Sequence, residues 1–149
     1  MRECAASTLD MLERSRGSLL AACQAHDVAE RYLQAQLGAL RAGAALVAAR
    51  SGPAHRLDGQ PQRRGVTGRP GDLWSLLAEV APELGEWAEF FAHSTARREH
   101  IAKGSAVVST READDLLRQA ETFADLVATM LGLPRHAGHG DLLIPTVRA

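Results

Sequence analysis

The sequence is poor in cysteine and in aromatic residues, and it has no long apolar run. Its two cysteines, Cys4 and Cys23, cannot form a disulfide framework and show no CxxC or zinc-ligand spacing. Cys23 falls in an apolar helical pattern, where we expect a buried, reduced thiol. The longest apolar run, residues 42–49, is far shorter than the roughly 18 residues that a membrane span requires. These absences exclude a disulfide scaffold, a zinc module and a membrane-spanning helix.

Lysine is almost absent as well, because Lys103 stands alone against 16 arginines. We interpret that bias as a mark of GC-rich coding. The net charge of −1 and the pI of about 6.6 provide no global field that would draw the chain to nucleic acid or membrane. The first residues include Arg2 and Glu3 and do not form the apolar segment of a signal peptide. We therefore expect a cytoplasmic protein.

What the sequence does contain is a helical apolar pattern along a chain of one-domain length. The 149 residues can bury a core without metal or disulfide. Apolar residues recur at three- and four-residue spacing, and no strand-like alternation appears. We predict helices over residues 7–25, 28–49, 72–80, 82–103 and 110–131. In the first helix the residues expected to face inward are Leu9, Leu12, Leu19, Leu20 and Cys23.

Helix ends are marked by capping signals. Asp27 with Glu30, and Ser109 with Glu112, have the spacing of a capping box, in which two free backbone amides are satisfied. Pro82 suits the first turn of a helix and breaks the one before it. Further caps are expected at Ser7, Asp72, Gly104 and Gly132.

Residues 51–71 interrupt the pattern with five glycines and three prolines, so we expect a flexible loop. The loop is basic and can either act as a solvated linker or contact nucleic acid, through Arg56, Arg63, Arg64 and Arg69. The predicted fold class is therefore all-α, an antiparallel bundle of four to five helices with one long basic loop. We expect a single domain over residues 7–132 and a mobile tail over residues 133–149.

The candidate site lies on the predicted helix 82–103. His93, Arg97 and His100 lie at i, i+4 and i+7 and so line one side of it. Arg98 comes seven residues after Phe91 and continues the inward stripe, where a cation needs an acid partner or a bound anion. One interpretation is a phosphate or RNA-backbone site with an imidazole available for proton transfer. The other is a helix end where basic side chains complement the dipole and Arg98 pairs with a carboxylate.

Acidic residues crowd the first turn of the last predicted helix. Asp114 can pair with Arg118 at i+4, or these acids can receive Arg97 or Arg98. A metal-binding pair of Asp114 and Asp115 is the alternative, although adjacent helical positions point about 100° apart. In the tail, His136, His139 and Asp141 have ligand chemistry but no preformed geometry. We predict no metal and no cofactor.

Two stretches resemble a branch of the HEPN superfamily (higher eukaryotes and prokaryotes nucleotide-binding) found in GC-rich bacteria. They are LWSLLAEVAPELGEWAEFFAHSTARREHIAK, residues 73–103, and TREADDLLRQAETF, residues 110–123. With the alanine-rich second helix, the resemblance covers roughly residues 7–132 without the loop. It implies an all-helical bundle, often dimeric, associated with RNA, nucleotides or a partner nucleotidyltransferase.

Many HEPN ribonucleases carry an arginine followed, after four to six residues, by a histidine. Arg50 and His55 are the only match, and chance alone supplies about two such matches in a chain of this composition. We therefore carry no catalytic residue over, and we expect a noncatalytic module that binds RNA, nucleotide or a protein partner, with no membrane association. The site residues are Arg97, Arg98, His93 and His100. The alternatives are a metal-independent, toxin-like ribonuclease that uses His93 or His100, and a purely structural interaction bundle.

Self-association is the last expectation from the sequence. Phe90 and Phe91 are consecutive, so both cannot face one narrow seam, and one of them must occupy a second surface. Large aromatic side chains are common interface anchors. We therefore expect a homodimer formed through helical faces.

Overall fold

The computed structural model describes residues 2–58 and 70–133. The tail with His136, His139 and Asp141, and the loop residues Arg63, Arg64 and Arg69, lie outside the described residues, as do the side chains of His55 and Arg56. The described chain is helical and contains no strand. Its elements are α1 (Arg2–Gln24), α2 (Val28–Asp58), α4 (Pro70–Val80), the 3₁₀ turn η1 (Pro82–Leu84), α5 (Gly85–Ala102) and α6 (Thr110–Met130). The predicted all-α bundle is confirmed.

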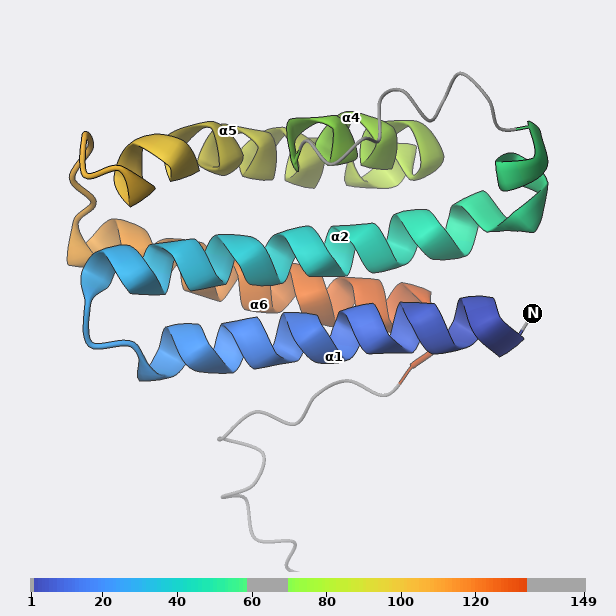
Figure 1. Ribbon diagram of the computed structural model, residues 1–149, viewed down its shortest axis with the longest axis horizontal. Coiled ribbons are helices and arrows are strands. Elements are labelled where there is room, and N and C mark those ends of the chain that lie inside the picture. The colour runs from blue at the N-terminus through green and yellow to red at the C-terminus, as the bar shows by residue number, and fades with distance from the viewer. Residues whose placement is uncertain (1, 59–69, 134–149) are drawn as a thin grey trace, which may run out of the picture.

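The long helix α2 lies between two layers, with α4 and α5 on one side and α1 and α6 on the other (Figure 1). Helices that follow each other through a short connection, α1–α2 and α5–α6, run antiparallel, whereas α2 and α6 run in the same direction. Two hydrogen bonds agree with this arrangement: one joins Ser15 of α1 to Gly38 of α2, and the other joins Gln36 of α2 to Thr95 of α5. Because α2 contacts all the other helices, it is the centre of the fold.

Small side chains let the neighbours approach α2 closely. Ala35, Ala39, Ala42 and Ala45 are all fully buried along it. A Cβ on Gly43 would lie 3.2 Å from the indole of Trp74, so the absence of a side chain there makes room for α4. Leu33, Leu37 and Leu40 of α2 are only partly buried, because the alanines occupy the positions that face its neighbours most closely.

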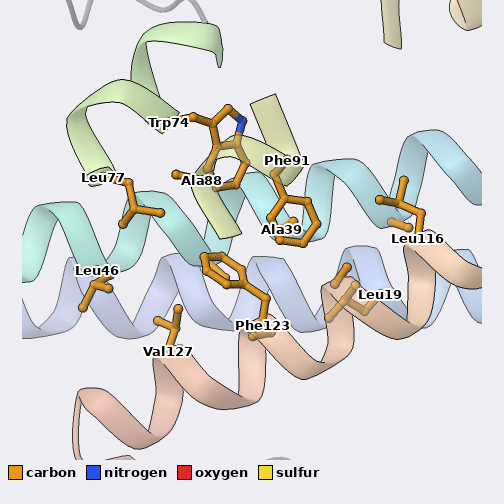
Figure 2. Packing of buried hydrophobic residues seen from close by; sticks show 14 of the residues in the cluster. Leu19, Ala39, Leu46, Trp74, Leu77, Ala88, Phe91, Leu116, Phe123 and Val127 are labelled. Carbon is orange, nitrogen blue, oxygen red and sulfur yellow. The ribbon is translucent and has the colours of Figure 1, made fainter. Parts of the chain in front are cut away.

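Large apolar area is supplied by aromatic rings from α4, α5 and α6. The ring centroids of Trp74 and Phe91 are 5.3 Å apart, and those of Phe91 and Phe123 are 5.1 Å apart. Figure 2 shows these three side chains together beside α2. Trp87 joins the edge of the group, 5.6 Å from Phe123. The rings therefore supply the core volume that the alanines of α2 lack.

The prediction for the inward face of α1 is confirmed at Leu12 and Leu19 and is wrong at the other three residues. Leu9 and Leu20 are 48% and 50% exposed, and Cys23 is also exposed. Besides Leu12 and Leu19, the buried face carries Thr8, Ser15, Ser18 and Ala22. The physical reason is close approach to α2, where a leucine in place of Ser15 or Ser18 would push the helices apart.

Two contacts across this seam show how close the helices are. Ser15 donates a 2.7 Å hydrogen bond from Oγ to the Gly38 carbonyl. A Cβ on Gly38 would lie 2.6 Å from Leu19 Cδ2. The thiol of Cys23 faces Glu121, with Sγ 3.8 Å from Oε2, and burial together with that carboxylate raises the pKa of the thiol.

Most predicted helix ends are confirmed, and the differences have local causes. Gly104 and Gly132 end α5 and α6 with φ of 78° and 72°, a conformation that glycine adopts without strain. Helix α4 starts at Pro70 rather than at Asp72, because proline fits a first helical turn. Ser7 lies inside α1, which begins at Arg2, and so does not cap it.

The predicted loop begins later than expected, because residues 51–58 continue α2. Pro53 removes one backbone hydrogen bond, which bends a helix without necessarily ending it. The last turns of α2 turn away from its main axis (Figure 1). Within residues 2–58 and 70–133, no helix combines the length and apolar character needed to cross a bilayer.

The two capping boxes differ in completeness. At α6, Ser109 Oγ accepts from the Glu112 amide at 3.0 Å, and Glu112 Oε1 accepts from the Ser109 amide at 3.2 Å. At α2, Asp27 Oδ2 accepts from the Glu30 amide at 2.9 Å, but the Glu30 carboxylate accepts from Gln34 instead of returning to Asp27. Only half of the first predicted box therefore forms.

The aromatic core yields a matched pair of tests. Phe123→Ala removes a fully buried ring at the junction of α4, α5 and α6, so we expect a loss of about 3–5 kcal/mol in the free energy of unfolding. Phe90→Ala removes a ring that is 45% exposed and should cost under about 1.5 kcal/mol. Urea denaturation followed by circular dichroism measures both. Equal losses would contradict this core.

Candidate functional site

The four predicted site residues all lie on α5 between its midpoint and its C-terminal end, but on two different faces. His93 and His100 are exposed, whereas Arg97 and Arg98 are half-buried. Arg97 shares the flank of the two histidines and turns toward the start of α6. Arg98 belongs to the inward stripe, seven residues after the fully buried Phe91. The structure therefore brings the four residues near one end of the bundle without joining them in a single cluster.

Arg97 is held by α6 and by the loop before it. Its Nη1 donates to Glu112 Oε2 at 2.7 Å, and its Nη2 donates to the Val107 carbonyl at 3.1 Å. The guanidinium carbon lies 6.0 Å from the centre of the Tyr32 ring. This confirms the predicted alternative in which the acids at the start of α6 receive Arg97. Glu112 therefore serves both the helix cap and this ion pair.

Arg98 has no such partner. Its Nε is shielded from solvent and makes no hydrogen bond to the described residues. Its terminal nitrogens are not among the buried unpartnered atoms, so they reach solvent, and no described carboxylate lies within ion-pair distance of them. The predicted pairing of Arg98 with a carboxylate is therefore not found in this part of the chain.

The other arginines with described side chains have polar partners, unlike Arg98. Seven of them, on every helix that carries one, make an ion pair: Arg14, Arg16, Arg31, Arg50, Arg97, Arg111 and Arg118. Arg41 donates to Ser18 Oγ at 2.8 Å. Arg98 is the exception among the described side chains, and it is also among the less exposed arginines.

The histidine at the end of α5 touches the turn that follows. Nδ1 of His100 lies 3.4 Å from Ser105 Oγ, and that hydroxyl donates to the His100 carbonyl at 3.1 Å. His93 lies two turns earlier on the same exposed flank. Both imidazoles are accessible to a ligand from solvent.

The carboxylates at the start of α6 serve as ion-pair partners. Asp114 Oδ1 accepts from Arg31 Nη1 at 2.6 Å, so the predicted pair of Asp114 with Arg118 is wrong. Arg118 instead pairs with Asp115, three residues before it. Asp114 reaches across to α2 because it faces the bundle, which the spacing alone does not reveal. In the described residues no group of three or more metal-ligating side chains comes together.

Arg31 makes contacts between helices that the sequence alone did not predict. Besides Asp114, it reaches the Ala25 carbonyl with Nη2 at 2.8 Å and so joins the α1–α2 turn to α6. Its neighbour Tyr32 is buried beneath Arg97. Burial raises the pKa of the Tyr32 phenol, Arg97 opposes that shift, and Glu112 adds to it.

Arg50, the arginine of the nuclease-like spacing, makes contacts with the α4–η1 junction. Arg50 Nη1 lies 2.9 Å from Glu83 Oε2 and 3.2 Å from the Val80 carbonyl, so it ties α2 to the α4–η1 junction. A backbone hydrogen bond and Arg50 lower the pKa of the Glu83 carboxyl. Arg50 is therefore engaged in the fold.

The structure also contains a groove between α4 and α5 that the sequence did not predict. It encloses about 280 Å³ and is lined mostly by small side chains, with these residues around it: Trp74, Ser75, Ala78, Gly85, Ala88, Glu89 and Ala92. Glu89 is the single ionisable group among them, and it is acidic, so the groove does not favour an anion.

A family model described as SAV_6107-like HEPN matches residues 22–128. The chain belongs to this HEPN family. The match begins near the end of α1 and spans α2 to α6, which includes all four candidate site residues. No curated protein and no solved structure matches the chain.

Tyr32 provides a pH test of the contacts around Arg97. Because its phenol pKa is raised in the folded state, the folded state favours the protonated phenol. That contribution is fully present below the ordinary pKa of about 10 and is lost as the pH rises through the raised value. We expect Tyr32→Phe to lose less thermal stability than the wild-type chain between about pH 9 and about pH 11. If the melting temperatures of the two proteins fell equally over this pH range, the raised pKa of Tyr32 would be contradicted.

Proposed function

We propose that this chain is a noncatalytic HEPN module that binds a phosphate-bearing ligand, RNA or nucleotide, at the second half of α5. The observation that supports the proposal is the unpaired guanidinium of Arg98, whose terminal nitrogens reach solvent. His93 and His100 lie nearby on the exposed flank, and Arg97 adds a cation held in place by Glu112.

The physical basis is partial desolvation. The half-buried guanidinium of Arg98 loses part of its hydration, and no carboxylate of residues 2–58 or 70–133 with a described side chain replaces it. A phosphate oxygen supplies the missing counter-charge and matches the planar fork of donors. Arg97, by contrast, must first leave Glu112 before it can bind a phosphate directly. Arg98 is therefore the principal anion-binding residue of the proposal.

Substitution of Arg98 tests this proposal. Arg98→Met keeps the aliphatic length and removes the charge, so we expect about 10-fold weaker binding of a fluorescent single-stranded RNA or nucleotide. The dependence of binding on salt should also become less steep, by about one phosphate contact. Arg14→Met, on the exposed face of α1, is the matched control and should bind as the wild-type chain does. Fluorescence anisotropy measures all three proteins.

Two outcomes would replace the proposal. Defined cleavage of RNA in the presence of EDTA, lost in His100→Ala, would make the chain a metal-independent ribonuclease. If neither RNA nor nucleotide raised the melting temperature, a structural interaction module would remain. In that case co-purification from native cells would identify a protein partner, such as a nucleotidyltransferase.

Dimerisation is part of the same proposal. Phe91 is fully buried and the next ring, Phe90, is 45% exposed, which supports a second apolar surface on α5. Trp87, one turn earlier, is partly exposed beside it. We expect Phe90→Asp to dissociate a homodimer while helicity stays intact, because a charge would be placed at an apolar contact. Light scattering at micromolar concentration is the measurement, and a wild-type mass that stays at 16.0 kDa would contradict the dimer.

A further inference from the structure

A polar cluster that is buried at Gln36 and Trp74 and partly buried at Thr95 joins α2, α4 and α5 beside the apolar core. Thr95 Oγ1 lies 2.5 Å from Gln36 Nε2 and accepts from Trp74 Nε1 at 2.8 Å. Gln36 and Trp74 are almost completely buried, at 0% and 1% exposure. The cluster is thus isolated from bulk solvent on the side of α2.

One atom of this cluster is left without a partner. Gln36 Oε1 is buried and makes no hydrogen bond to the described residues. Turning the amide over would let Oε1 accept from the Thr95 hydroxyl, but it would leave Nε2 unpartnered instead. In both orientations one polar atom of Gln36 needs a further group, because an unsatisfied buried atom is costly.

The complementary atom lies one helical turn away. Arg98 follows Thr95 by three residues on α5, and its Nε is a buried donor without an acceptor. Side chains lean toward the start of their own helix, and α2 and α5 run antiparallel. We therefore expect Gln36 and Arg98 to lean toward each other, which would direct a buried acceptor and a buried donor into the space between the two helices.

We propose that Gln36 positions Arg98 through one bound water molecule, which accepts from Arg98 Nε and donates to Gln36 Oε1. A water is the smallest group that performs both functions. Because the water holds Nε on the buried side of the guanidinium, the terminal nitrogens of Arg98 keep a fixed orientation toward solvent. The consequence for anion binding rests on the proposed function, whereas the water site itself does not.

A double-mutant cycle tests whether the two side chains share one space. Gln36→Glu places a carboxylate where it can pair with Arg98 in place of the water. We expect the melting temperature of Gln36→Glu to fall only slightly, and that of Gln36→Glu combined with Arg98→Met to fall by more than the sum of the single changes. Additive shifts would overturn the proposal, because they would mean that the two groups do not face each other.

A high-resolution crystal structure of the wild-type chain tests the water directly. Density within hydrogen-bond distance of both Gln36 and Arg98 supports the proposal. A direct hydrogen bond between the two side chains, or an apolar closure of the space, overturns it. This measurement and the cycle are independent of any ligand, so they stand even if the wild-type chain binds no phosphate and the proposed function fails.

The positioning role has its own measurement. Gln36→Met keeps the length of the side chain and removes the water-binding atom, so we expect the affinity for a fluorescent nucleotide to fall about fivefold. Gln34→Met, on the same helix, is the control and should bind normally, since Gln34 contacts Glu30 and not α5. Unchanged affinity in Gln36→Met, with wild-type binding intact, would reject the positioning role.

Discussion

The close approach of small residues along α2 determines the arrangement of the other helices. Ala39 and Ala42 are fully buried, and Gly43 leaves room for the indole of Trp74. Helix axes usually lie about 8–10 Å apart, and small residues at the contact favour the short end of that range. Since alanine buries little area, the apolar volume is concentrated in the rings of Phe91 and Phe123. The aromatic cluster is therefore a consequence of the alanine-rich centre.

Local rules predicted the helices well because helix ends depend on neighbouring residues. The Ser109–Glu112 box and the glycine at 132 act within one turn, and the structure has both. The buried face of α1 could not be predicted in the same way. Leu9 and Leu20 lie on one helical stripe and Leu12 and Leu19 on another, and both stripes fit a core-facing helix. The choice between them depends on Gly38 of α2, a residue distant in sequence, which admits only a close neighbour.

The candidate site was likewise predictable in its location but not in its pairing. Helical spacing placed Arg97 and Arg98 on different faces of α5, and Phe91 identified the inward one. Which arginine meets Glu112 depends on the angle between α5 and α6, for which the sequence holds no local signal. Arg97 forms the ion pair with Glu112, whereas Arg98, which faces inward and has a buried Nε, has no acidic partner among the described residues.

Because Arg97 pairs with Glu112, Arg98 is left without an acidic partner among the described residues. Keeping the guanidinium of Arg98 half-buried without an acidic partner among the described residues costs part of its hydration free energy. A fold selected for stability alone has simple alternatives at this position, because a methionine would fill the same space without a charge. Membership in the HEPN family explains the bundle but does not by itself assign a ligand. The proposed anion site depends on an arginine that the fold partly buries and that no described acid neutralises, because a bound anion would supply the missing counter-charge.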